Sequence, residues 1–281
     1  MLPIIKSVVV LFILAKILSI GVASAQIPYG SNPKAGAYLN VGDAKIYYEV
    51  YGTGKTVVLL HGGLFGYIDE YQSIIPSLAK QYQVLLIATR GHGKSEIGTA
   101  TFSYKQFAED AYKVIRNVTN DSIRLIGFSD GADQGYYLAT SRPETVSKFV
   151  AIGGNWGAAD FNSETREWMN NLNGKAFEKN FAGFVTERKK LMPEPHRFAE
   201  FVDKLAAVWK ADSYVSPEVI SSINCQTMIM AGETDSCPVE RYVDMYRKLK
   251  KGSLAIIPGS NHLVLEHQPK LVEDIILRYF K

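Results

Sequence analysis

Short apolar runs alternate with amphipathic stretches along most of the chain. Runs rich in Val, Ile, Leu and Tyr predict strands at residues 45–51, 56–60, 83–89, 122–128, 148–153, 226–231 and 253–257. Apolar residues at helical spacing predict helices at 69–80, 104–118, 130–141, 238–250 and 266–279. This alternation predicts an α/β fold, with a mostly parallel sheet flanked by helices. Ligands bind such sheets beyond the carboxyl ends of the strands, so the loops at that edge are the ones to search.

One interval, residues 155–223, breaks the alternation. It has no clear buried strand, and its aromatic residues include Trp156, Trp168, Phe177, Phe181, Phe184, Phe198 and Trp209. We predict several amphipathic helices that form a lid over the top edge of the sheet, inserted between core segments 26–154 and 224–281. Most of the aromatics should form the lid's own core. Some should line the pocket it covers, and Trp156 and Phe128 are the candidates for that lining.

The first 25 residues have the pattern of a secretory signal peptide. Lys6 gives a short positive start, an apolar run covers residues 8–15, and the segment ends in Ala23-Ser24-Ala25. We therefore expect cleavage after Ala25 and a secreted or periplasmic protein. The alternative is an uncleaved anchor, but Lys16 interrupts the apolar residues before they reach the roughly 20 that a spanning helix needs. The mature chain is expected not to insert stably into a membrane.

Composition narrows the classes of function. The chain has 281 residues, of which 47% are hydrophobic and 21% charged, as in ordinary globular proteins. A net charge of +3 gives no electrostatic case for nucleic acid. Two cysteines cannot build paired Cys-x-x-Cys zinc clusters. A Cys225–Cys237 disulfide is not favoured, since the strand between them is about 20 Å long and a bridge needs Cα atoms within about 7 Å.

The sequence Gly-Phe-Ser-Asp-Gly at residues 127–131 carries the clearest chemistry. It matches G-x-S-x-G and lies between a predicted strand and a predicted helix, the context of a nucleophile elbow. Ser129 is the candidate nucleophile. A serine hydroxyl is a weak nucleophile, so a base must take its proton.

Two residues on other loops of the same edge complete a triad. His262 follows the strand at 253–257 and is the candidate base, and Asp235 follows the strand at 226–231 and can orient the imidazole. Glu233 is the alternative acid. The chain order Ser, Asp, His is the order that accompanies a nucleophile elbow of this kind.

Acyl transfer also needs an oxyanion hole. The backbone N–H of Asp130, at the start of a helix, is one candidate donor. The second should come from the turn at residues 61–64, with Gly63 as first choice and Leu64 as second. The side chain of His61 is expected to fix its own loop.

These segments give the chain a clear resemblance to the α/β-hydrolase fold superfamily, and to its lidded branch of esterases, enol-lactonases, haloperoxidase-like enzymes and C–C bond hydrolases. The segments that match are LLHGG at 59–63, RGHGKS at 90–95, GFSDG at 127–131, GETD at 232–235 and SNH at 260–262. The resemblance favours Asp235 over Glu233 as the acid. It also implies that Arg90 and His92 are structural.

The sequence therefore predicts a serine hydrolase that cleaves a small ester, lactone or related acyl compound, with no metal and no cofactor. Haloalkane dehalogenases and epoxide hydrolases of this superfamily have aspartate at the elbow, so the serine found here argues against both activities. Perhydrolase or C–C hydrolase chemistry on the same triad stays open, as does a non-catalytic ligand-binding protein on the same fold. The oligomeric state is unknown. Asp133 is expected to be a solvated or capping charge, and His196 and His267 are expected on the surface.

Overall fold

The computed structural model describes residues 27–211 and 214–281. The predicted signal peptide therefore lies outside the described residues. Among the helices of the described ranges, none is both long enough and apolar enough to cross a membrane.

An eight-stranded sheet forms the centre of the molecule, in the order β1-β2-β4-β3-β5-β6-β7-β8. β1 and β2 pair antiparallel with each other, and β2 pairs antiparallel with β4. From β4 to β8 every pair is parallel. The strands are β1 Gly36–Asn40, β2 Lys45–Tyr51, β3 Thr56–Leu60, β4 Gln83–Ile87, β5 Ile123–Phe128, β6 Val146–Ile152, β7 Gln226–Gly232 and β8 Gly252–Ile257. The predicted fold class is confirmed.

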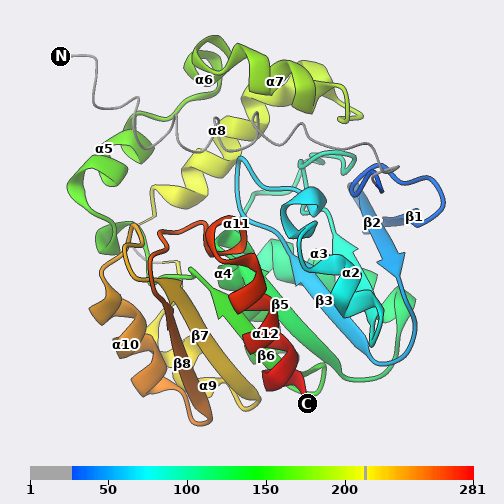
Figure 1. Cartoon of the computed structure of the whole chain (residues 1–281). Helices are drawn as coiled ribbons and strands as arrows, with labels where there is room; N and C mark the ends of the chain where they lie inside the picture. Colours follow the sequence, from blue (N-terminus) through cyan, green and yellow to red (C-terminus); the bar gives the residue numbers. More distant parts are fainter. Residues whose placement is uncertain (1–26, 212–213) are drawn as a thin grey trace.

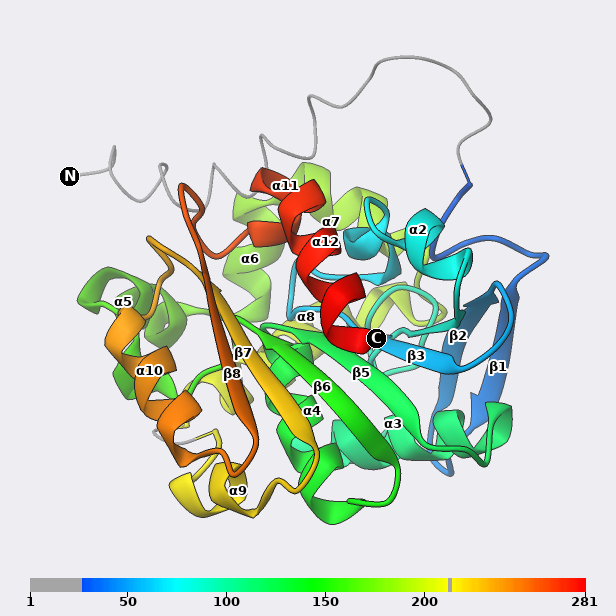
Figure 2. The ribbon, with the colours of Figure 1, turned by 60° about the horizontal axis from the view of Figure 1, so that its bottom comes forward.

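Helices cover both faces of the sheet because successive side chains of its strands point to opposite sides. On β3, Val58 and Leu60 join one hydrophobic cluster, whereas Val57 and Leu59 join the other. The first cluster takes the buried sides of α3 Tyr104–Val118, α4 Asp130–Ser141 and α10 Val239–Lys248. The second takes η1 Ile68–Tyr71, α2 Ile75–Ala79, α11 Val264–His267 and α12 Pro269–Phe280. In Figures 1 and 2, α12 lies in front of the sheet and α3 and α4 behind it.

Two predicted helices are broken at prolines. The predicted helix at 69–80 is two short pieces, η1 and α2, and Pro76 lies in the first turn of α2. The predicted helix at 266–279 is α11 followed by α12, which begins at Pro269. Proline has no backbone N–H to donate within a helix, so it is accommodated in a first turn. The edge strand β1 was not predicted, because its side chains are only half buried or exposed and show no apolar run.

The segment between β6 and β7 is helical, as predicted. It contains η2 Ala158–Asp160, α5 Ser163–Asn171, α6 Gly174–Asn180, α7 Ala182–Lys189, η3 Pro195–Arg197, α8 Phe198–Trp209 and α9 Pro217–Ser222. α5 to α8 gather beyond one end of the sheet, at the top of Figure 1. α9 instead packs against α4 and α10 near the opposite end. The predicted lid segment therefore includes one helix that belongs to the layer beside the sheet.

Both cysteines are free thiols. Cys225 is partly buried and Cys237 fully buried. The expectation that they are not bridged agrees with this arrangement.

Candidate active site

Ser129 lies at a sharp turn between β5 and α4. Its φ of 53° and ψ of −121° are strained for a residue with a side chain, and it is the one non-glycine residue of the described ranges with positive φ. A Cβ at Gly127 would overlap the backbone of Gly131, and a Cβ at Gly131 would overlap the carbonyl of Leu60. The glycines on either side therefore make the turn sterically possible, as in a nucleophile elbow.

His262 and Asp235 meet beyond the ends of β8 and β7. His262 Nδ1 lies 2.9 Å from Asp235 Oδ1. The Asp235 side chain is fully buried, whereas that of His262 is 16% exposed. Burial alone would raise the pKa of Asp235, but the charge and hydrogen bond of His262 keep it below its usual range. Burial opposes protonation of His262, but the same carboxylate raises the pKa of the imidazole above its usual value.

The elbow lies beside this pair. The ring of Phe128 lies 5.0 Å from the ring of His262, centroid to centroid. The carboxylate of Asp130 is close enough to contribute to the raised pKa of His262. Phe128, next to Ser129, thus packs against the imidazole.

Glu233, the alternative acid, has another role. Its carboxylate accepts a hydrogen bond of 2.9 Å from the backbone N–H of Gly259, in the loop that leads to His262. The side chain is exposed and is not the acid that contacts the imidazole.

The turn after β3 is held by two side chains. Glu70 accepts the backbone N–H of Gly62 at 2.7 Å, so this N–H is not available to a substrate. The N–H of Thr89 donates to Nε2 of His61, and Nδ1 of His61 lies 2.6 Å from the Gly62 carbonyl. His61 therefore fixes its own loop, as expected.

Asp130 links the elbow to the helical insertion. Nε1–H of Trp209, the last residue of α8, donates to both carboxylate oxygens of Asp130 at 3.0 and 2.9 Å. The hydroxyl of Tyr104 donates to the same group at 3.1 Å. Burial raises the pKa of Asp130 to about 6, and these two donors oppose the rise. A Cβ on Gly63 would clash with both Trp209 and Asp130, so this contact lies against the predicted oxyanion loop. No motif or hydrophobic pattern predicts this pairing, which joins residues 79 positions apart in the chain.

We expect Trp209→Phe to lower the free energy of unfolding by about 1.5–3 kcal/mol at pH above 7, because it removes the donor to a buried carboxylate. The cost should shrink below the pKa of about 6, where Asp130 is protonated in the folded protein. Urea unfolding on both sides of that pH measures the difference.

Trp168→Phe is the matched control. Its ring lies 6.1 Å from that of Trp209, and it has no hydrogen bond to Asp130. A similar loss of stability in both variants, without dependence on pH, would contradict a specific role for the Trp209–Asp130 contact.

Asp133 corrects one expectation. It is 1% exposed rather than solvated, and its carboxylate accepts the backbone N–H of Asn155 at 3.0 Å. Burial raises its pKa well above the usual value, and the nearby charge of Asp130 raises it further. His196 and His267 are exposed, as expected.

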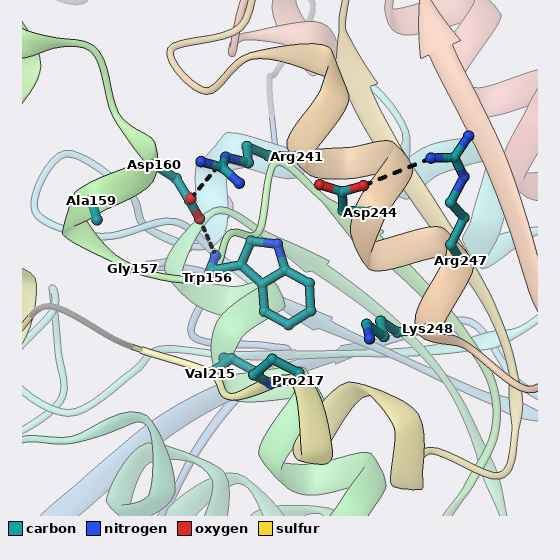
Figure 3. Close-up of a pocket in the computed structure, with 10 residues that line it drawn as sticks. All are labelled: Trp156, Gly157, Ala159, Asp160, Val215, Pro217, Arg241, Asp244, Arg247 and Lys248. Carbon is teal, nitrogen blue, oxygen red and sulfur yellow. Dashed lines mark hydrogen bonds and ion pairs between the residues drawn. The ribbon is translucent and has the colours of Figure 1, made fainter.

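The two residues expected to line the pocket lie in different places. Phe128 is 3% exposed beside His262, as described above. Trp156 lines a pocket of about 580 Å³ formed by η2, the start of α9 and α10 (Figure 3). Its polar lining residues are Asp160, Arg241, Asp244, Arg247 and Lys248, and none of the triad residues is among the lining. This pocket gives no support to a role for Trp156 near Ser129.

Comparison with known proteins identifies the family. A family model described as alpha/beta hydrolase fold matches residues 56–269, which is most of the chain. The chain belongs to the α/β-hydrolase fold family.

Several relatives match this α/β-hydrolase over part of their length. The uncharacterized hydrolase YraK of Bacillus subtilis is 33% identical over 114 residues, which cover 40% of this chain and 42% of that protein. The chain thus spans less than half the length of the first curated relatives it matches.

Solved structures agree over nearly the whole fold. A serine hydrolase involved in carbazole degradation superposes with a TM-score of 0.70 at 21% identity, covering 87% of this chain and 98% of that one. The enol-lactonase of Burkholderia xenovorans superposes with a TM-score of 0.69 at 14% identity, covering 87% and 99%. At these identities the likeness establishes the fold.

The segment 90–95 of this α/β-hydrolase is a buried scaffold. Arg90 is 1% exposed and forms ion pairs with Asp110 at 2.8 Å and Asp43 at 2.9 Å. His92 packs between His61 and Phe201, with both ring centroids 4.8 Å away, and burial lowers its pKa to about 4. His92 is therefore neutral near pH 7.

Proposed function

We propose that this protein is a serine hydrolase that cleaves a small ester, lactone or related acyl substrate through Ser129, His262 and Asp235. The observation that carries the proposal is the buried His262–Asp235 hydrogen bond beside a strained serine elbow. Relatives named as an esterase/lipase and an enol-lactonase support this class of bond.

The hydrogen bond between His262 and Asp235 determines which nitrogen of the imidazole can accept a proton. Because Nδ1–H of His262 is held by the Asp235 carboxylate, Nε2 carries the free lone pair. Nε2 takes the hydroxyl proton as Ser129 Oγ attacks the carbonyl carbon. The developing oxyanion is held by the N–H groups of Asp130 and of Gly63 or Leu64, since that of Gly62 binds Glu70.

The tetrahedral intermediate then collapses. His262 gives its proton to the leaving oxygen, and Ser129 remains acylated. A water molecule loses a proton to Nε2 and attacks the acyl carbon. The bond between that carbon and Ser129 Oγ then breaks, Oγ takes the proton from Nε2, and the acid is released. Asp235 stays ionised throughout and stabilises the imidazolium.

Helices α5 to α8 act in this proposal as a lid that sets the size of the substrate pocket. A series of p-nitrophenyl esters of increasing acyl length, together with lactones, tests the function and measures the pocket. Hydrolysis of short esters or lactones supports the proposal. Absence of turnover, together with no labelling of Ser129 by a fluorophosphonate probe, would favour a ligand-binding protein instead.

The dependence of activity on pH should follow His262. Its pKa lies above the usual value of 6.5, and only the neutral imidazole can accept the serine proton. We therefore expect kcat/KM to fall as pH decreases through a value above 6.5. A profile from about pH 5 to pH 9 on the best ester measures it. If kcat/KM instead falls with a midpoint at or below about pH 6, the titrating group would be Asp130 rather than His262.

We also propose that residues 1–25 direct export and are removed. Expression of the full chain with its native start, followed by determination of the amino terminus of the exported protein, tests this. A terminus at Gln26 supports it, and retention of residues 1–25 would contradict it.

A further inference from the structure

The two oxygens of the Asp235 carboxylate have unequal surroundings. Oδ1 interacts with Nδ1 of His262 at 2.9 Å and accepts the N–H and hydroxyl of Ser236 at 2.7 and 3.1 Å. Oδ2 is buried and has no hydrogen-bond partner within the described residues. A buried carboxylate oxygen without a donor is costly, so this atom calls for an explanation.

Tyr242 is a candidate donor. It belongs to α10, which follows the loop that carries Asp235 and packs on β7 and β8. Tyr242 is 1% exposed, and its hydroxyl also has no hydrogen-bond partner in ranges 27–211 and 214–281. Two buried polar atoms without partners among the described residues thus belong to a loop and to the helix that directly follows it. Burial raises the pKa of the phenol well above 10, and the charge of Asp235 raises it further.

Other titratable groups near the phenol fit a donor role. Cys237 from the same loop and Tyr136 from α4 both raise the pKa of Tyr242 further. Burial raises the pKa of Cys237 and of Tyr136 as well, so both are neutral near pH 7. Asp235 is therefore the one ionised group among those that raise the pKa of Tyr242.

We propose that Tyr242 is a positioning residue whose hydroxyl donates a hydrogen bond to Oδ2 of Asp235. The Tyr242 hydroxyl and Oδ2 of Asp235 then satisfy each other as donor and acceptor, and Oδ1 keeps its orientation toward His262. The hydrogen bond also draws negative charge toward Oδ2, away from the imidazole. This role rests on the proposed function, since it matters for catalysis only where the His262–Asp235 pair acts on Ser129.

Tyr242→Phe tests the role, with Tyr246→Phe as the matched control. Tyr246 lies one turn further along α10 and is 37% exposed. We expect Tyr242→Phe to lower kcat about tenfold, the effect of one hydrogen bond to a charged group. Without the donor, more charge remains on Oδ1 and stabilises the imidazolium. The acid limb of kcat/KM should then move to higher pH, and Tyr246→Phe should change neither quantity.

A second readout does not depend on turnover. The second readout is the far-downfield ¹H NMR signal of Nδ1–H of His262. Its chemical shift should change in Tyr242→Phe and stay the same in Tyr246→Phe. An unmoved signal and an unmoved pH limb in a folded Tyr242→Phe protein would overturn the role while leaving the proposed function intact. Loss of the proposed function would show separately, as a wild-type protein without turnover.

If Tyr242→Phe does not fold, a crystal structure of the wild-type protein decides. An oxygen–oxygen distance of about 2.5–3.0 Å between Tyr242 and Asp235 Oδ2 supports the proposal. A separation beyond hydrogen-bond reach would overturn it.

Discussion

Replacing Ser129 with alanine is expected to lower kcat by about 10⁴- to 10⁶-fold. Without the hydroxyl no acyl-enzyme forms, and only the oxyanion donors and substrate binding remain to accelerate direct attack by water. Alanine accepts the backbone of Ser129 no worse than serine does, because both have one Cβ at the same φ of 53°. The protein should therefore fold, and thermal unfolding followed by circular dichroism checks this alongside kcat on the best ester.

Ser222→Ala is the control for loss of a hydroxyl elsewhere. Ser222 ends α9, is exposed, and donates to the carbonyl of Val219 at 2.8 Å. This variant should keep full turnover and full labelling by a fluorophosphonate probe, whereas Ser129→Ala should lose both. Substantial turnover in a folded Ser129→Ala protein would show that another group is the nucleophile.

The loops of the candidate site were predictable because a parallel sheet brings the carboxyl ends of its strands to one edge. Ser129, Asp235 and His262 each follow such a strand, so strand prediction was enough to assign all three to one edge of the sheet. The choice between Glu233 and Asp235 was harder, since both follow β7 within three residues. The chain turns there so that Asp235 is buried against His262 and Glu233 holds Gly259 from the surface.

Contacts that depend on side-chain packing were beyond prediction. Trp209 reaches Asp130 from the helical insertion, and no hydrophobic pattern in the sequence predicts how that insertion packs on the core. The burial of Asp133 depends on how the segment after β6, which includes Asn155, packs on α4. The hydrophobic pattern of this short helix gives no indication of that contact. Tyr242 likewise reads as an ordinary apolar position of α10, and only the structure shows that its hydroxyl is buried without a partner among the described residues.

Replacing Asp235 with asparagine should lower kcat by about 10⁴-fold near neutral pH. The amide keeps the shape of the carboxylate but removes the charge that raises the pKa of His262 and stabilises the imidazolium. If the amide NH₂ faces Nδ1, the proton of the imidazole moves to Nε2, which can then no longer accept the serine proton. The acid limb of any remaining kcat/KM should move to lower pH, because burial then acts on His262 without the opposing charge.

Glu233→Gln separates this effect from a general loss of acidic charge near His262. Glu233 lies two residues before Asp235 and is exposed, and glutamine can still accept the N–H of Gly259 through its carbonyl oxygen. We expect less than about a threefold change in kcat, since exposed charges contribute little across solvent. If Glu233→Gln lost as much activity as Asp235→Asn, the acid would have to be reassigned. With the difference as expected, the buried carboxylate of Asp235 is the group that makes His262 a base.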